Sequence, residues 1–359
     1  MTDISTEPLG LPDPASAPMD ALLRRSWHPV AIEAEVGDEP VGVTLLGERL
    51  VLFRGADDVV RGFHDVCVHR GTSVALGWRD GDCLVCPFHG WSYDGEGACV
   101  RIPAQEAHPI PARARLQPVP TVTRLGHVWM CLDDDPVVEP PDYPEWDMEG
   151  MRVVVCPPYD WSCHALRRLE NFLDFAHFAW VHPGILGDRD HPEVPEHEVW
   201  VEHDRLGVRQ PRPEPKLGVK NADVDEADLT EDGRVMTVMH YAGYPPLAAQ
   251  LSQELPSGRR YSVFIAPSPV DEHTARTFWL VARNYDLDEP DETFVQFQVD
   301  VVAQDQPIVE SQRPERIPPD ITAELHVRDD KVSLAWRRLL TDLGRRALDE
   351  PVGSAAAER

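Results

Sequence analysis

Short runs of apolar residues, separated by turn residues, dominate the chain from Trp27 to Leu132. Runs of this length with frequent turn signals are typical of β-strands, and no helix of useful length is predicted in this part. The predicted strands are Val41–Leu46, Arg49–Arg54, Val59–His64, Cys83–Cys86, Ala98–Ile102 and Val128–Leu132. The pattern therefore predicts a small all-β module.

The rest of the chain mixes helical and strand periodicity. The segment His164–His182 carries apolar residues at helical spacing and predicts one helix. Residues 291–310 begin as a helix, and Lys331–Leu348 predicts an amphipathic C-terminal helix. Strands are predicted at Val199–Val208, Val235–Tyr241, Tyr261–Ile265 and Arg276–Arg283. The fold class is α+β: an all-β module followed by a sheet with helices packed against it.

Composition changes along the chain predict the domain boundaries. Residues 1–20 are predicted to be disordered, 21–135 to form the first domain and 136–150 to be a Pro- and acid-rich linker or surface loop. Residues 151–350 form the second domain and 351–359 a disordered tail. Residues 185–195 and 213–232 are rich in Gly, Pro and acidic residues and predict loops.

The charge and the cysteine content exclude several classes of protein. The 359 residues carry a net charge of −28, which disfavours binding to nucleic acid and to anionic membranes. No apolar run is long enough to span a membrane, and the N-terminus lacks the apolar core of a signal peptide. The seven cysteines are an odd number in a chain without a signal peptide, which argues against a disulfide framework. We expect a cytoplasmic protein.

The first candidate metal site consists of two paired motifs, Cys67-Val-His69 and Cys86-Pro-Phe-His89. Thiolate and imidazole ligands suit zinc as well as an iron–sulfur cluster. Zinc sites more often pair Cys with Cys and His with His. One Cys and one His in each motif favour a Rieske [2Fe–2S] cluster, with two thiolates on one iron and two imidazoles on the other.

Two neighbours of these motifs are candidates for tuning the cluster. Arg70 follows a predicted ligand, and its charge would favour the reduced, more negative cluster. The hydroxyl of Tyr93 is placed to reach a ligand sulfur. Ordinary turn packing is the alternative interpretation of both residues.

The second candidate metal site contains His177 and His182. On a regular helix a spacing of five would separate them by about 140°. Pro183 disfavours helix at His182, so the helix is predicted to end there and to let His182 turn back. Two histidines and one carboxylate make the triad of non-haem Fe(II) oxygenases.

The carboxylate is predicted to be Asp305. It continues the stripe of Phe294, Val301 and Val302 on the helix from residue 291, so it faces inward. Its competitor Asp300 lies on the polar face. A charged group on a buried face needs a partner or a metal. Pro307 is predicted to loosen the helix near this position.

Together these stretches resemble the terminal oxygenase (α) subunits of Rieske non-haem iron oxygenases. The matching segments cover nearly the whole chain: Leu23–Ala31, Cys67–Gly71, Cys86–Tyr93, Glu170–Gly187, Asp305–Glu315 and the end near Asp329–Leu343. Within this family the chain is similar to the aromatic-ring-hydroxylating, vanillate demethylase-like and pheophorbide oxygenase-like branch. The order of two independent metal motifs makes the resemblance specific.

The resemblance implies a fold and an assembly. We expect an N-terminal Rieske domain and a helix-grip (START-like) catalytic domain with an antiparallel sheet and flanking helices. A head-to-tail homotrimer is implied, in which Asp174 bridges His89 of one chain and His177 of the next. From the sequence, Asp174 is predicted to share a helical face with His177, and a surface ion pair is the alternative. Asn171 is expected to lie near the iron as a supporting residue.

The expected function is a terminal oxygenase component. Electrons from NAD(P)H would arrive through a ferredoxin or flavin reductase partner, since no nucleotide-binding motif is found here. With O2, the Fe(II) site would hydroxylate or oxidatively demethylate a small aromatic or polycyclic substrate. The alternatives are a Rieske electron carrier without oxygenase activity, a zinc-stabilised binding protein, and desaturation or cyclisation at the same site.

Overall fold

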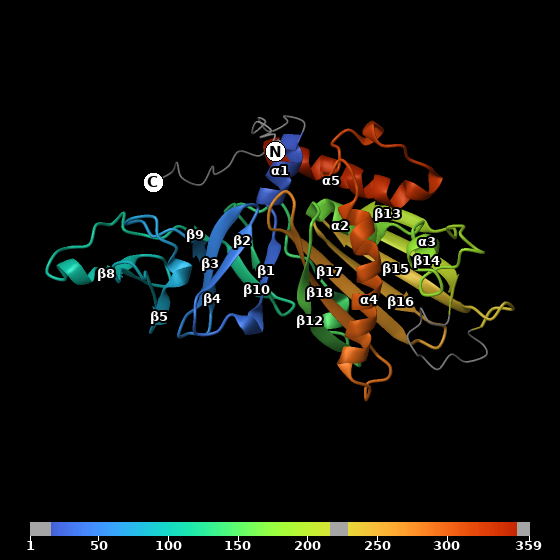
Figure 1. Cartoon of the computed structure of the whole chain (residues 1–359), viewed down its shortest axis with the longest axis horizontal. Coiled ribbons are helices and arrows are strands. Elements are labelled where there is room, and N and C mark those ends of the chain that lie inside the picture. Colours follow the sequence, from blue (N-terminus) through green and yellow to red (C-terminus); the bar gives the residue numbers. More distant parts are fainter. Residues whose placement is uncertain (1–15, 216–228, 350–359) are drawn as a thin grey trace, which may run out of the picture.

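The computed structural model describes residues 16–215 and 229–349. Its two parts lie side by side in Figure 1, with the first strands on one side and a large sheet carrying the long helices on the other. The α+β class with an all-β first domain is confirmed. In this described part no helix is long and apolar enough to cross a membrane.

The first part consists of three small antiparallel sheets, with strand orders β1-β11-β10, β2-β3-β4-β9 and β5-β6-β7-β8. Their strands are β1 (His28–Ile32), β2 (Val41–Leu45), β3 (Glu48–Arg54), β4 (Val60–His64), β5 (Trp78–Asp80), β6 (Cys83–Val85), β7 (Ser92–Tyr93), β8 (Cys99–Arg101), β9 (Pro118–Val119), β10 (Thr121–Arg124) and β11 (His127–Met130). The Cys67/His69 motif follows β4, whereas the Cys86/His89 motif lies between β6 and β7. The two motifs meet where these two sheets pack together, because Cys67 and Cys86 share one core cluster.

The second part is built on one seven-stranded antiparallel sheet of order β12-β18-β17-β16-β15-β14-β13. Its strands are β12 (Arg152–Trp161), β13 (Glu198–Glu202), β14 (Arg205–Glu214), β15 (Val235–Tyr244), β16 (Ala248–Glu254), β17 (Arg260–Pro269) and β18 (Ala275–Arg283). The chain leaves the sheet after β12, forms the helices of the second metal motif, and returns at β13.

Helices cover one face of this sheet (Figure 1). They are α1 (Ala17–Arg24), α2 (Ala165–Leu173), α3 (Phe178–Val181), α4 (Asp291–Glu310) and α5 (Lys331–Asp349). Leu166 and Leu169 of α2 and Trp336 of α5 belong to the same core cluster as Val263 and Trp279 of the sheet. Burial of these side chains holds α2 and α5 against the strands.

Two predictions of helix boundaries are wrong. The single helix predicted over His164–His182 is two helices, because Asp174 adopts an extended conformation and ends α2. The disorder predicted for residues 1–20 is wrong for 17–20, which begin α1. Residues 1–15, the predicted tail 351–359, and residues 216–228 of the predicted loop 213–232 lie outside the described residues.

The helix α4 continues through Pro307 to Glu310, so the predicted loosening is wrong. Its inward face is confirmed, since Phe294, Val301 and Asp305 are buried. The strand predicted over Val199–Val208 is a hairpin, with both His203 and Asp204 in the left-handed region. The structure also has β12 and β16, which the sequence pattern did not predict.

Residues 136–150 are attached to the second sheet. Tyr143 is buried and its ring lies 5.4 Å from that of Phe264. The carboxylate of Glu145, also buried, accepts a hydrogen bond of 3.0 Å from the Gln250 side chain. Two side chains of the predicted linker or surface loop are therefore buried, and their contacts join this connection to the second part.

Candidate active site

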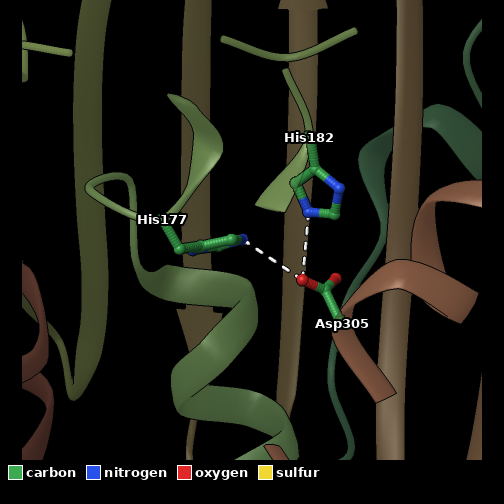
Figure 2. Close-up of side chains that lie close together, drawn as sticks. All are labelled: His177, His182 and Asp305. Atoms are coloured by element: carbon green, nitrogen blue, oxygen red, sulfur yellow. Dashed lines mark ion pairs between the residues drawn. The ribbon is translucent and has the colours of Figure 1, made fainter. Parts of the chain in front are cut away.

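His177, His182 and Asp305 converge beneath the helical layer (Figure 2). His177 immediately precedes α3 and His182 immediately follows it, whereas Asp305 comes from α4. Asp305 Oδ1 lies 3.0 Å from His182 Nε2 and 3.5 Å from His177 Nε2. His182 and Asp305 are buried. The predicted triad residues are therefore brought together.

Hydrogen bonds on the far side of each imidazole determine its tautomer. His182 Nδ1 lies 2.7 Å from Gln304 Oε1, and His177 Nδ1 lies 3.1 Å from Asp174 Oδ1. Both partners are acceptors, so both Nδ1 atoms carry the proton and both Nε2 atoms present lone pairs.

Three lone pairs thus face one another. His182 Nε2 and Asp305 Oδ1 are buried and have no hydrogen-bond partner among the described residues. Two unprotonated acceptors 3.0 Å apart repel each other unless a proton or a metal cation lies between them. Imidazole nitrogen and carboxylate oxygen are ligands that suit Fe(II), so this donor set fits the predicted ion.

The carboxyl groups at the site are ionised. Burial alone would raise the pKa of Asp305, but the facing His182 and His177 and the Arg168 cation lower it below its ordinary value. Burial likewise opposes ionisation of Asp174, and the hydrogen bonds from His177 lower its pKa. Each group can therefore hold a cation or a protonated imidazole nitrogen.

Asp174 reaches His177 by a route that the sequence did not predict. The two residues do not share a helical face, since Asp174 follows the last residue of α2. Its Oδ1 instead accepts from both the backbone N–H and the ring of His177, each at 3.1 Å. The predicted contact is present although its predicted geometry is wrong. Asn171 lines the same cavity as His177 and accepts a hydrogen bond from Arg168.

Gln304 is a site residue that sequence reasoning missed. It is exposed, yet its amide oxygen reaches the buried His182 ring. Adjacency to Asp305 was the only signal in the sequence. The contact depends on how α3 and α4 cross, which periodicity does not report.

Replacing Gln304 with leucine should weaken Fe(II) binding about 10- to 100-fold, because His182 loses the acceptor that fixes its tautomer. Fe(II) titration of protein with an intact cluster and an empty mononuclear site measures this. Gln296→Leu is the matched control, because Gln296 lies on the same helix and bonds Asp300 instead. Equal affinities for the two variants would show that Gln304 does not support His182.

The other two motifs form matching turns. Gly71 N–H bonds the carbonyl of Cys67 at 2.8 Å, and Gly90 N–H bonds that of Cys86 at 3.0 Å. Both glycines have positive φ, 72° and 69°, which L side chains rarely adopt. Each turn thus brings the backbone back to its cysteine, so that the histidine of the motif lies close to that cysteine.

These turns bury the cysteines and leave the histidines at the surface. Cys67 and Cys86 are buried, whereas His89 is exposed and His69 is half-buried. The rings of the two histidines lie 4.5 Å apart. Two thiolates inside and two imidazoles at the surface fit the ligand set of a Rieske [2Fe–2S] cluster.

Tyr93 lies where the sequence predicts it, with its hydroxyl 3.1 Å from Cys67 Sγ. Burial raises the pKa of Tyr93, so it stays protonated and can donate to the sulfur. Arg70 is exposed beside His69, and its effect on the cluster stays a prediction. Trp91, which the sequence reasoning did not single out, stacks on the His69 ring at 4.6 Å.

Each of the two parts of the chain matches a known domain family. Residues 26–122 match the Rieske [2Fe-2S] domain, and residues 161–346 match the vanillate O-demethylase oxygenase C-terminal domain. The chain belongs to the Rieske non-haem iron oxygenases. It is 33% identical over 329 residues to methylxanthine N1-demethylase NdmA of Pseudomonas putida, covering 89% of each chain.

Two further comparisons agree with this assignment. The N3-demethylase NdmB of Pseudomonas putida is 34% identical over 91% of each chain. The solved structure of NdmA with caffeine superposes with a TM-score of 0.81 at 32% identity, over 95% of this chain and all of that one.

As a Rieske oxygenase, the protein is the oxygenase component of a multi-protein system. Electrons from NAD(P)H pass from a reductase or ferredoxin partner through the [2Fe–2S] cluster to mononuclear iron. With O2, this system hydroxylates or demethylates a small organic substrate. A bare electron carrier and a zinc-binding protein are thereby excluded, because the second domain matches the catalytic domain of the family.

Proposed function

We propose that the protein removes a methyl group from nitrogen or oxygen of a small aromatic molecule. The three facing lone pairs of His177, His182 and Asp305 support an iron site, and the similarity to the demethylases NdmA and NdmB supports the reaction. We assign the cluster to four ligands: Cys67, His69, Cys86 and His89. In this proposal residues 21–135 form the domain that receives electrons, and residues 151–350 form the domain in which dioxygen reacts.

Iron at the triad would supply the binding and reduction of dioxygen. The residues of the chain keep the donors correctly oriented. Asp174 and Gln304 hold the two imidazoles with their Nε2 lone pairs inward. The cavity beside them, about 70 Å³ in this structure, is lined by the aromatic side chains Phe172, Phe178, Tyr241 and Trp279, whose apolar faces suit a flat ring once these side chains move apart.

We further propose a head-to-tail homotrimer in which electrons cross between chains. The side chain of Asp174 is 35% exposed and lines a depression of about 310 Å³. Ile308 and Leu325 line the same depression and are exposed. Around the cluster motifs, Phe88 and Leu76 are exposed in the same way. Two apolar rims around complementary metal sites suit a subunit interface. Asp174 would then bridge His177 and the neighbouring copy of His89.

A cytoplasmic location is part of this proposal. All seven cysteines are free, as expected in a reducing compartment, where thiol ligands stay available for a cluster.

A product screen tests the proposed reaction. Purified oxygenase, a surrogate reductase, NADH and labelled O2 are incubated with N-methyl and O-methyl aromatic compounds. Formaldehyde released in step with substrate-dependent O2 consumption supports demethylation. Labelled hydroxyl on a retained carbon, or loss of two hydrogens without label, would instead assign hydroxylation or desaturation.

A further inference from the structure

Arg168 is a buried cation in the wall of the active-site cavity. It lies on α2, is 2% exposed, and lines the same cavity as His177, His182 and Asp305. Its hydrogen bonds go to Tyr159 and Asn171 and to none of the three iron ligands.

Only neutral groups contact its guanidinium in the described structure. Nε and Nη2 donate to the Tyr159 hydroxyl at 3.1 and 2.8 Å, and Nη1 donates to Asn171 Oδ1 at 3.0 Å. The guanidinium carbon lies 4.6 Å from the ring centre of Trp161. A guanidinium has five N–H donors, so these three bonds leave donors over for a ligand.

Other buried arginines of the described chain are paired with carboxylates. The ion pairs are Arg25–Asp135, Arg167–Glu324, Arg212–Glu214, Arg283–Asp291 and Arg337–Glu170. Arg168 has no such pair among the described residues. Burying a cation without a counter-ion is costly, and the cost is recovered when an anion binds.

We infer that Arg168 binds an anionic oxygen group of the substrate and so selects aromatic substrates that carry one. This inference rests on the proposed function and adds a substrate class to it. The cavity lining contributes one negative charge from Asp305 and one positive charge from Arg168. With a ferrous ion bound, the cavity carries a formal excess of about two positive charges, which favours an anion.

The aromatic lining defines the rest of the ligand. Phe172 of α2 and Trp279 of β18 both line the cavity that contains Arg168. A flat ring between such walls would place its anionic substituent on the guanidinium, with planar, charge-assisted hydrogen bonds. A methyl group elsewhere on the ring would then point towards the iron ligands.

Matched pairs of methoxybenzoates and methoxybenzamides, in ortho, meta and para forms, test this inference. Binding is measured on anaerobic holoenzyme with oxidised cluster, from the relaxation of probe methoxy protons by the ferrous ion. We expect at least one benzoate to bind about tenfold or more tightly than its amide. Arg168→Met should weaken that benzoate about 10- to 100-fold and leave the amide nearly unchanged.

Two further variants complete the design. Arg168→Lys should retain part of the preference, because it keeps the charge but loses the planar fork. Arg209→Met is the control, since Arg209 lies on β14 with a partly exposed side chain. Iron content and thermal unfolding are measured for each variant.

No preference for any benzoate in the parent protein would overturn the inference, as would equal losses for both members of a pair in Arg168→Met. If Arg168→Met fails to fold, the Arg168→Lys preference decides. Failure of the proposed function would look different, as absence of the mononuclear iron or of formaldehyde. Those readouts do not depend on probe charge.

Discussion

Replacing Asp174 with asparagine should leave both iron centres bound and reduce turnover at least about 100-fold. The amide oxygen can still accept from His177, so the imidazole keeps its tautomer. The negative charge that we propose to join His177 to the cluster of the neighbouring chain is lost, and carboxylates beside a ligating imidazole tune and orient it. Iron analysis, the optical spectrum of the cluster and steady-state demethylation measure the three parts of this expectation.

A single-turnover experiment separates electron transfer from the chemical step. Reduced enzyme is mixed with substrate and O2, and reoxidation of the cluster is followed optically. In Asp174→Asn we expect the cluster to stay reduced. Asp300→Asn is the control, since Asp300 is an exposed carboxylate on α4 that bonds Gln296. Reoxidation of the Asp174 variant at the rate of the parent would contradict the proposed bridge.

The metal motifs were predictable because their geometry is local. In each cluster motif the cysteine and the glycine that closes its turn lie four positions apart, Cys67 with Gly71 and Cys86 with Gly90. Pro183 likewise predicted that the helix ends at His182, and α3 does end just before that residue. The inward face of α4 followed from periodicity, which selected Asp305 over Asp300.

The break between α2 and α3 was not predictable from periodicity. No Gly or Pro interrupts residues 165–182, so local preference favours one helix. The structure breaks it because the Asp174 carboxylate accepts the His177 backbone N–H, as Asp side chains do where helices begin or turn. A competing side-chain contact therefore decided the local structure.

Proline explains the missed strand β12. No strand was predicted over residues 152–161, and Pro157 and Pro158 within them are not typical of a central strand. β12 lies at the edge of the sheet, and its pairing with β18 shifts register between Cys156 and Tyr159. An edge position with a bulge accommodates both prolines.

Residues that act through partners distant in sequence remained hidden. Gln304 bonds a ring 122 positions away, and Arg168 is distinguished from Arg167 only by the absence of a described carboxylate partner. Neither property leaves a spacing signal in the chain. The sequence therefore predicted the reaction class, whereas the choice of substrate required the cavity.

Asp305→Asn should remove the mononuclear iron and abolish turnover, and yet leave the metal-free protein about as stable as the parent. Without a metal, Asp305 Oδ1 lies 3.0 Å from His182 Nε2, and the facing histidines and Arg168 stabilise the ionised form of this carboxyl group. An amide in place of the carboxylate gives up this electrostatic stabilisation, but it also removes a buried charge and can donate a hydrogen bond to Nε2. Because the two effects offset each other, we expect the free energy of unfolding of the metal-free protein to change by less than about 1 kcal/mol.

This combination distinguishes loss of a ligand from loss of structure. A damaged fold would lower both iron content and stability, whereas loss of a ligand lowers only the first. Iron should fall from about three to about two per chain, because the cluster keeps its pair. The midpoint of thermal unfolding of the metal-free protein should change by no more than a few degrees. Asp300→Asn should change neither quantity, and loss of iron in that variant with retention in Asp305→Asn would reassign the carboxylate ligand.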